Sequence, residues 1–441
     1  MSGAQRPPYA KLEDLSPVDD GKAVSVAGWV EDVRNLGGVG FIILRQREGT
    51  LQLTFKKKED QEIFGRAMAF NRESVIAATG KVVANKQARN GFEILPTVLE
   101  VLSPADAPLP LGVVDKVGAE LDTRLDNRFM DLRKPEHRAL FAIRSLALRS
   151  IRDYMYSKDF VEVHTPKLAG AGAEGGASLF ETDYFGKRAF LSQSPQLYKQ
   201  MLMATGFDRV FEISPAFRAE PSDTIRHITE FVSFDAEVAF IRHQEDFLKM
   251  LEECIVGSVA YVKEHGKEHL ETLGYDLKVP SLPIPRLLYV DAIGILQEND
   301  KKVKEGDDID TEGEKIIGRA MQEKGHELYY IRDYPSAIKA FYVMPKQDDP
   351  EYSNSFDMEY KGMEMASGGQ REHRYNLLVE RMKAFGLDPV NFDFYLKPFR
   401  YGMPPHGGWG FGIDRFVQKM LDLPNIREAV LFPRDRNRLI P

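Results

Sequence analysis

FEISPAFRAEPSDTIRHITEFVSFDAE, residues 211–237, contains two segments of strand composition on either side of a turn at Pro221-Ser222-Asp223. This arrangement predicts a β-hairpin. Arg218 and Glu220 lie two positions apart, so both side chains project from one face of the first strand. An arginine fork binds a phosphate through two hydrogen bonds, which indicates a phosphate site, although a solvated charged face is the plainer alternative. The return strand is predicted to carry Arg226, His227, Phe231 and Asp235.

The composition of the chain is that of an ordinary globular protein. Its 441 residues predict two or three domains. The single cysteine, Cys254, excludes an internal disulfide, and no apolar stretch of about 18 residues occurs. We therefore expect a cytoplasmic protein without membrane spans. The net charge of −8 excludes little, because a nucleic-acid partner needs only a local basic surface.

The domain organisation follows from a change in character along the chain. Residues 22–102 contain five short β-rich segments with glycines between them, which predicts a small OB-fold barrel. A stretch at 103–110 with three prolines and no periodicity predicts a linker. The predicted divisions are a barrel domain at 1–104, a linker or hinge at 105–130 and a larger domain at 131–441.

The larger domain is predicted to be α+β. Apolar residues at helical spacing predict helices over 136–156 and 244–263. Clustered strands without βαβ alternation predict an antiparallel sheet flanked by helices. The expected strands lie at 189–193, 209–214, 230–240, 341–345, 355–367 and 408–415. A charged stretch at about 280–330 is expected to be a peripheral insertion.

Two common phosphate motifs do not apply. Residues 170–175, GAGAEG, match the dinucleotide pattern in letters, but an extended segment follows instead of the required helix. A glycine-rich loop carrying Glu174 is the better interpretation. Gly80-Lys81 is followed by valine, so a P-loop is excluded as well.

Three segments, in order, resemble the motifs of the class II aminoacyl-tRNA synthetases. The hairpin at 211–237 is similar to motif 2 of subclass IIb, which contains the aspartate, asparagine and lysine enzymes. Phe160-Val-Glu-Val-His-Thr-Pro166 resembles motif 1, the dimer element, which implies a homodimer with Pro166 at its interface. Gly408-Trp-Gly-Phe-Gly-Ile-Asp-Arg415 resembles motif 3. The fold implied is an N-terminal OB-fold plus a class II synthetase catalytic domain.

The resemblance implies that an amino acid is activated with ATP and then transferred to tRNA. Arg218 and Arg415 would be the catalytic residues, because the reaction joins two anions and needs positive charge. The implied ATP site consists of Arg218, Ala219, Glu220, Arg226, His227, Ile228, Phe231, Glu364, Gly412, Ile413, Asp414 and Arg415. Mg²⁺ would be held by Asp357, Glu364 and Ser367, whose hard oxygen ligands suit it; scattered surface acids are the alternative.

Two further segments resemble the amino-acid pocket of the aspartyl-tRNA synthetases in their compact archaeal-type form. They are SQSPQLYK at 192–199 and MASGGQR at 365–371. Lys199 and Arg371 together would oppose one anionic side chain, and asparagine would leave that buried charge unpaired. The implied aspartate ligands are Glu174, Gln196, Lys199, Arg218, Asp235, Ser367 and Arg371.

The barrel carries the residues that the family uses for the anticodon. By resemblance these are Arg34, Phe41, Gln52, Arg89 and Glu93, with Phe41 as a stacking platform; a core phenylalanine is the alternative. Glu31 and Arg89 align with positions linked to the choice of tRNA, and this pair fits neither the strict nor the relaxed type cleanly. The expected partner is tRNA(Asp), and the charging of tRNA(Asn) stays open.

Other functions remain as alternatives. An asparaginyl-tRNA synthetase shares the fold, as does an asparagine synthetase that forms an aspartyl adenylate. The barrel argues against the latter, because a free amino acid product needs no anticodon domain. A non-catalytic tRNA-binding paralogue could lose Arg218, Glu364 or Arg415, and all three are present.

Overall fold

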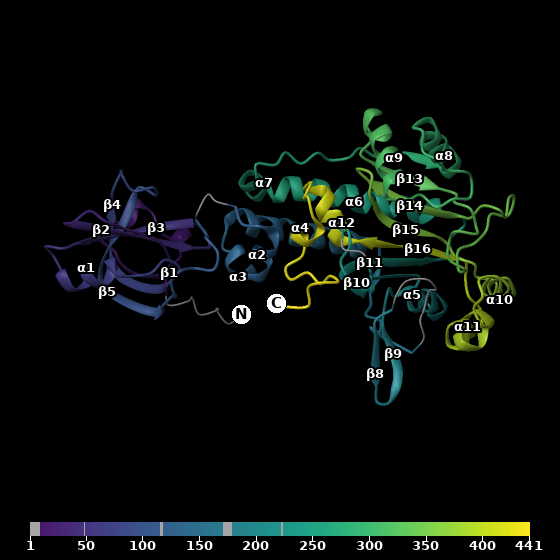
Figure 1. The fold of residues 1–441 in the computed structure, drawn as a ribbon, viewed down its shortest axis with the longest axis horizontal. Coiled ribbons are helices and arrows are strands. Elements are labelled where there is room, and N and C mark those ends of the chain that lie inside the picture. Colours follow the sequence, from purple (N-terminus) through teal and green to yellow (C-terminus); the bar gives the residue numbers. More distant parts are fainter. Residues whose placement is uncertain (1–8, 48, 115–117, 171–178, 222–223) are drawn as a thin grey trace. The chain divides into compact units, whose positions relative to one another are not determined.

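The structure is a computed structural model of the chain, and it describes residues 9–47, 49–114, 118–170, 179–221 and 224–441. The chain divides into two compact units, Met1–Glu120 and Leu121–Pro441 (Figure 1). Each unit has a hydrophobic core of its own. Within the described part of the chain, the helices are all too short or too polar to cross a membrane.

The first unit is a closed five-stranded barrel, as an OB-fold requires. The strands are β1 (Ala23–Asn35), β2 (Val39–Gln46), β3 (Gly49–Lys56), β4 (Val75–Ala84) and β5 (Phe92–Ser103), in the order β1-β2-β3-β5-β4. Alternate apolar residues such as Val26, Ile42 and Leu53 fill its interior. Two short 3-10 helices, η1 (Leu12–Asp14) and η2 (Pro17–Asp19), precede the barrel, and helix α1 (Gln61–Met68) packs Phe64 into its core. The OB-fold prediction is confirmed.

The second unit is built on an eight-stranded sheet (Figure 1). The strands are β6 (Val161–Glu162), β10 (Arg209–Phe217), β11 (Glu230–Ala239), β12 (Arg286–Leu288), β13 (Leu328–Arg332), β14 (Ser355–Tyr360), β15 (Glu364–Gln370) and β16 (His406–Gly412), in the order β12-β13-β14-β15-β16-β11-β10-β6. The six central strands pair antiparallel, and the edge strands β12 and β6 pair parallel. The predicted α+β class is confirmed, with a mixed sheet in place of a purely antiparallel one.

Long helices cover the core of this sheet. They are α4 (Pro135–Ser157), α6 (Glu245–His265), α7 (Lys267–Leu273) and α12 (Ile413–Met420). Helix α4 starts at Pro135, where the missing N–H costs nothing. Its apolar stripe meets that of α6, and both pack with Phe234 and Trp409 of the sheet. Helices α4 and α6 match the predicted helices within about two residues.

A smaller layer lies beside the main sheet. It contains α5 (Gln196–Leu202), η3 (Met203–Thr205), α10 (Tyr375–Ala384), η4 (Pro389–Phe392), α11 (Asp393–Arg400) and a three-stranded sheet of β7 (Leu168–Ala169), β8 (Glu181–Tyr184) and β9 (Lys187–Leu191). The strand predicted at 341–345 is wrong. That segment forms only isolated bridges, at Val343 with Arg371 and at Pro345 with Ser353, because Pro345 has no N–H for a ladder.

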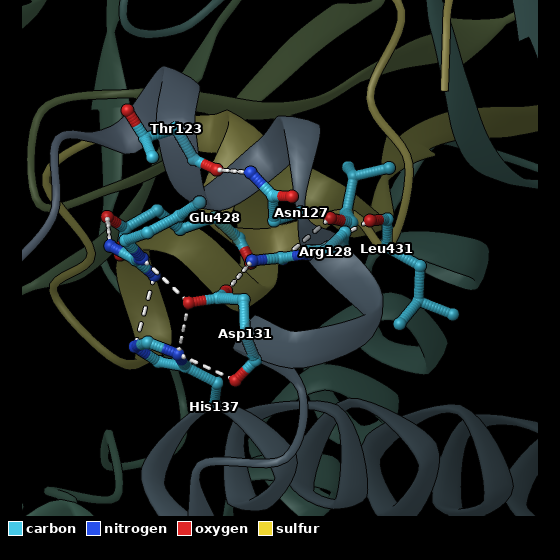
Figure 2. Close-up of polar contacts among 9 residues, drawn as sticks. Thr123, Asn127, Arg128, Asp131, His137, Glu428 and Leu431 are labelled. Carbon is cyan, nitrogen blue, oxygen red and sulfur yellow. Dashed lines mark hydrogen bonds and ion pairs between the residues drawn. The ribbon is translucent and has the colours of Figure 1, made fainter. Parts of the chain in front are cut away.

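The predicted linker at 105–130 is only partly irregular. Residues 121–130 form α2 (Leu121–Asp126) and most of α3 (Arg128–Asp131), within the second unit. Figure 2 shows why these helices are ordered: Arg128 donates to Asp131 at 2.6 Å and to the Leu431 carbonyl at 3.0 Å. His137 lies 2.8 Å from the same carboxylate. Buried polar partners far along the chain hold Arg128, and local sequence patterns do not reveal them.

The predicted peripheral insertion at 280–330 is part of the sheet. Helices α8 (Tyr289–Glu298) and α9 (Thr311–Glu323) lie between strands β12 and β13 in the chain. A last 3-10 helix, η5 (Ile426–Ala429), follows near the end of the described chain. Helix α9 approaches the β14–β15 turn closely: a Cβ on Gly318 would lie 2.4 Å from the Cα of Gly362. Two glycines thus allow backbone contact here and bring the polar side of α9 toward the functional site.

Candidate active site

A cavity of about 260 Å³ lies on the main sheet where β10, β11, β15 and β16 run side by side. Its walls include residues of the hairpin at 211–237, of the two pocket segments at 192–199 and 365–371, and of the glycine-rich segment at 408–415, whereas the segment at 160–166 does not line it. The predicted site residues that line it are Gln196, Arg218, Glu220, Arg226, His227, Ile228, Phe231, Asp235, Glu364, Ser367, Arg371, Gly412, Asp414 and Arg415. Ala219, Ile413, Lys199 and Asp357 are not among the lining residues, and Glu174 lies outside the described residues.

One end of the cavity contains a buried network of four charged side chains, Lys199, Asp235, Glu237 and Arg371. The Lys199 ammonium donates to Asp235 at 3.0 Å and lies 3.6 Å from Glu237. The Arg371 guanidinium donates to Glu237 at 2.9 Å. Both cations are about 2% exposed, so the ion pairs are well shielded from solvent. The two predicted cations therefore converge, and a carboxylate absent from the prediction, Glu237, lies between them.

Gln196 and Ser367 complete this end. Arg371 is 3.4 Å from the Gln196 side-chain oxygen, whereas the buried Gln196 amide nitrogen has no partner among the described residues. An unpaired buried donor is costly, which is a reason to expect a ligand acceptor beside it. Lys199 lies just beneath this surface and also donates to the Trp409 carbonyl at 2.7 Å.

At the other end of the cavity, Arg218 follows directly after β10. The strand ends at Phe217, so Arg218 and Glu220 do not lie on a strand as predicted, although the Arg218 N–H still donates to Thr229 at 2.9 Å. The Glu220 N–H donates to the Arg218 carbonyl at 2.8 Å, which closes a tight turn. The guanidinium lies 5.2 Å from the centre of the Phe231 ring. The turn directs the arginine over the ring of Phe231, which the resemblance assigns to the ATP site.

Arg226 and His227 lie in a turn, because β11 begins only at Glu230. The prediction that they belong to the return strand is wrong, since the Thr224 hydroxyl holds this turn: it accepts from the Arg226 N–H and shares a hydrogen bond with the His227 ring. Burial, and next the nearby Arg415, lower the pKa of His227. The imidazole is therefore expected to be neutral at pH 7.

Arg415 and Asp414 stand at the start of α12. Arg415 donates to the Glu364 carbonyl at 3.0 Å, which fixes it at the cavity wall. Asp414 accepts from Arg144 of α4 and, at 2.8 Å, from the Val232 N–H of β11. Its carboxylate thus ties three elements together, so we interpret Asp414 as a structural bridge in addition to a lining residue.

The predicted metal ligands differ in whether they face the cavity or are already paired with a protein cation. Glu364 and Ser367 line the cavity, and Ser367 is the register partner of Asp357. Both oxygens of Asp357 accept from Lys339, at 2.7 and 2.9 Å. Burial raises the pKa of Glu364. A search of the described ranges finds no group of three His, Cys, Asp or Glu side chains placed for a metal ion.

The barrel carries a separate polar pocket, lined by Glu31, Asp32, Arg34, Ile43, Thr50, Leu51, Gln52, Arg72, Gln87, Arg89, Asn90, Phe92 and Val114. Four of the residues discussed from sequence, Glu31, Arg34, Gln52 and Arg89, are among them. Gln52 donates to Glu93 at 2.8 Å, so these two predicted residues act as one unit. Phe41 is half-buried on β2 and does not line this pocket.

Sequence patterns missed several residues in or near the cavity, among them the charged residues Glu237, Glu314 and Lys339. Glu237 follows Asp235 at strand spacing, so the period of β11 could have indicated it. Lys339 and Glu314 lie in a loop and on a helix, outside every motif used. The sequence offers no local signal for either.

Comparison with known proteins agrees with this geometry. Residues 120–436 match the family of class II tRNA synthetases for D, K and N, and residues 24–102 match the OB-fold nucleic acid binding domain. The chain belongs to the class II tRNA synthetases of this group. It is 52% identical to the aspartate–tRNA(Asp) ligase of Pyrococcus horikoshii over 96% of this chain and 97% of the relative. It is 50% identical to the aspartate–tRNA(Asp/Asn) ligase of Methanosarcina barkeri, over 97% of each.

Solved structures show the same arrangement. The asparaginyl-tRNA synthetase from Pyrococcus horikoshii, complexed with asparaginyl-adenylate, aligns with a TM-score of 0.90 at 33% identity, over 98% of this chain and 99% of the other. The aspartyl-tRNA synthetase from Entamoeba histolytica aligns with a TM-score of 0.86 at 33% identity, over 98% and 92%. The synthetase fold therefore extends over nearly the whole chain.

Proposed function

We propose that this chain is an aspartate–tRNA ligase, which activates L-aspartate with ATP and transfers it to the 3′ end of tRNA(Asp). The observation that carries the proposal is the convergence of Lys199 and Arg371 on one buried carboxylate, Glu237. These cations come from α5 and from the end of β15, so they belong together only in the folded chain. The high identity to aspartate–tRNA ligases supports the same substrate.

The buried network explains how aspartate would be accepted. The charges of its two cations and two carboxylates sum to zero, so the negative charge of a bound side-chain carboxylate must be neutralised by an added positive charge. Aspartate itself supplies that positive charge, because its α-ammonium group can pair with Asp235 while its side-chain carboxylate pairs with Arg371. Asparagine would supply the ammonium without the carboxylate and leave a buried cation less paired, which costs roughly several kcal/mol. Gln196 and Ser367 would add hydrogen bonds, and Glu174 is proposed to close over the substrate.

The other end of the cavity would bind ATP. Arg218 is proposed to contact both the α-phosphate and the substrate carboxylate, which would offset the repulsion between the two reacting anions. Arg226, His227 and Arg415 line the part of the cavity that would receive the outer phosphates. His227 would act as a neutral hydrogen-bonding group, in keeping with its lowered pKa.

Glu364 and Ser367 fit Mg²⁺, which takes few protein oxygens and several from phosphates. When bound, the ion would neutralise charge on the phosphates of ATP. Asp357 would join this site only if its ion pair with Lys339 opened. The donor set on the cavity wall is therefore Glu364 with Ser367, and Asp357 is a reserve ligand.

The barrel is proposed to bind the anticodon. Phe41 would offer a ring for base stacking, and the polar pocket with Arg34, Gln52 and Arg89 would offer hydrogen bonds. Glu93 would orient Gln52. Whether tRNA(Asn) is also charged depends on this pocket, where Glu31 and Arg89 face the same space.

A homodimer is part of the proposal. Pro166 is exposed in the segment after β6, and apolar side chains around it, Tyr156, Val161 and Leu168, are 41–53% exposed. Exposed apolar residues gathered in one segment are typical of interaction surfaces. A cytoplasmic location stays a prediction.

The test is ATP–diphosphate exchange with aspartate, asparagine and lysine supplied separately. Exchange should depend on aspartate, with asparagine at least about a hundredfold less effective, the factor expected from one unpaired buried charge. Signal with asparagine alone would replace the proposal by asparagine activation. Charging of purified tRNA(Asp) and tRNA(Asn) would then decide which tRNA is accepted.

A further inference from the structure

Glu314, on α9, contacts two residues of the cavity wall, Arg226 and Glu364, from the stretch that the sequence suggests is peripheral. Its side chain is 8% exposed, and one carboxylate oxygen lies 2.8 Å from the Arg226 guanidinium. The other oxygen accepts from the backbone N–H of Glu364 at 3.3 Å. One buried carboxylate thus joins the arginine of the hairpin turn to the strand that carries the candidate metal ligand.

The helix that carries Glu314 is held firmly against this strand pair. Gly362 has φ +67°, and a Cβ there would lie 2.9 Å from the Glu314 carbonyl. Gly318, one turn further along α9, allows the same close approach. Because backbone packs on backbone here, the Glu314 carboxylate has little freedom to move away from Arg226.

Arg226 keeps a donor for a ligand. Its Nε is buried and has no partner among the described residues, whereas its terminal nitrogen Nη2 donates to Glu314. Arg226 also lines the cavity. A phosphate oxygen that entered this end of the cavity would meet a guanidinium whose orientation is already fixed.

We propose that Glu314 is a positioning residue for ATP: it orients Arg226 toward the outer phosphates and fixes the backbone at Glu364. The inference rests on the proposed function, and it names a residue outside the class II motifs. It also explains why α9 packs backbone to backbone against the β14–β15 turn.

The test compares ATP affinity in E314Q and in E312Q. Glutamine has one acceptor oxygen instead of two, so E314Q can satisfy Arg226 or the Glu364 N–H, but not both. Glu312 is on the same helix, exposed and paired with Lys301 at 2.7 Å, so E312Q is a matched control. We expect titration calorimetry with Mg-ATP to show affinity weakened roughly ten- to hundredfold in E314Q, the loss of one charge-assisted hydrogen bond. The control should bind ATP like the unmodified chain.

A double-variant cycle separates positioning from general stability. If Glu314 acts through Arg226, adding E314Q to R226A should weaken ATP binding by less than about twofold more. The aspartate KM in exchange should stay within about twofold in E314Q, since Glu314 bonds to Arg226 and Glu364, whereas Lys199 and Arg371 bond to Asp235 and Glu237. E314D, which keeps both acceptor oxygens, should bind ATP more tightly than E314Q and serves if that variant does not fold.

Unchanged ATP affinity in E314Q and E314D would overturn the inference, as would equal losses in E314Q with and without Arg226. A parallel rise in the KM values for ATP and aspartate would overturn it too, because that is the signature of a merely structural residue. Failure of the proposed function looks different: the unmodified chain would bind ATP yet show no aspartate-dependent exchange.

Discussion

The two ends of the cavity differ in how their cations are paired. At the amino-acid end, Lys199 and Arg371 are closed into a network with two buried carboxylates. At the nucleotide end, Arg218 has no ion pair with any described residue and rests on the Phe231 ring. Arg226 is paired on one side only. The charged network at the amino-acid end has no net charge, whereas the nucleotide end has cationic groups that are not paired with carboxylates of the described residues.

This difference suits the two proposed substrates. Aspartate is small and carries an ammonium group with its carboxylates, so a balanced, rigid network can distinguish it by small changes in pairing. ATP brings several negative charges and no positive one, so its site needs cations that protein carboxylates have not already neutralised. The contrast predicts that variants at the two ends affect different kinetic constants.

The largest effect is expected at Arg218. R218A removes the unpaired cation proposed to bridge both reacting anions, so aspartate-dependent exchange should fall on the order of a thousandfold or more. The thermal midpoint should change little, because Arg218 forms no ion pair within the described residues. Exchange assays and thermal unfolding of the purified variant check this together. Normal exchange in R218A would remove Arg218 from the reaction.

The next effect is expected at Glu237. E237Q removes the carboxylate shared by Lys199 and Arg371, and breaking a buried ion pair costs about 3–5 kcal/mol. We expect the aspartate KM to rise by on the order of a hundredfold, with the ATP KM nearly unchanged, alongside a lower thermal midpoint. E230Q, at an exposed glutamate on the same strand, is the control. Equal changes in both KM values would contradict the separation of the two ends.

A smaller effect, on stability alone, is expected for the network in Figure 2. Burial alone would raise the pKa of Asp131, but His137 and Arg124 outweigh it and lower the pKa from 3.8 to about 2. Because the folded-state pKa lies below the unfolded value, the stabilisation is present above about pH 4 and is lost as the pH falls toward 2. It amounts to about 2 kcal/mol at pH 7.

D131N should therefore lower the free energy of unfolding by about that amount at pH 7 and make it less dependent on pH between 4 and 2. Denaturant titrations of both proteins at pH 7 and pH 3 measure this. None of the residues bonded to Asp131 lines the cavity, so the KM values should not change. A changed aspartate KM would show that a buried charge network acts on the site from a distance.

Local patterns in the order of residues were enough to predict the barrel, two long helices and much of the site. Five short β-rich segments with glycines between them predicted the barrel, and helical spacing predicted α4 and α6. The resemblance of the hairpin, the glycine-rich strand and the two pocket segments to class II synthetase motifs predicted more than half of the residues that line the cavity. These features are contained in short stretches, so a single sequence is enough to find them.

The partners of the charged site residues, in contrast, depend on the folded chain. Glu314 is 88 residues from Arg226, and Glu237 is 134 residues from Arg371. Asp414 lines the cavity, yet its carboxylate accepts hydrogen bonds from Arg144 and from the Val232 N–H. The turn at Arg226 and the helices at 121–131 likewise depend on partners far along the chain or on side-chain hydrogen bonds. An ion pair forms when two side chains are close in space. Residues this far apart in sequence leave no periodic pattern that would predict such a contact.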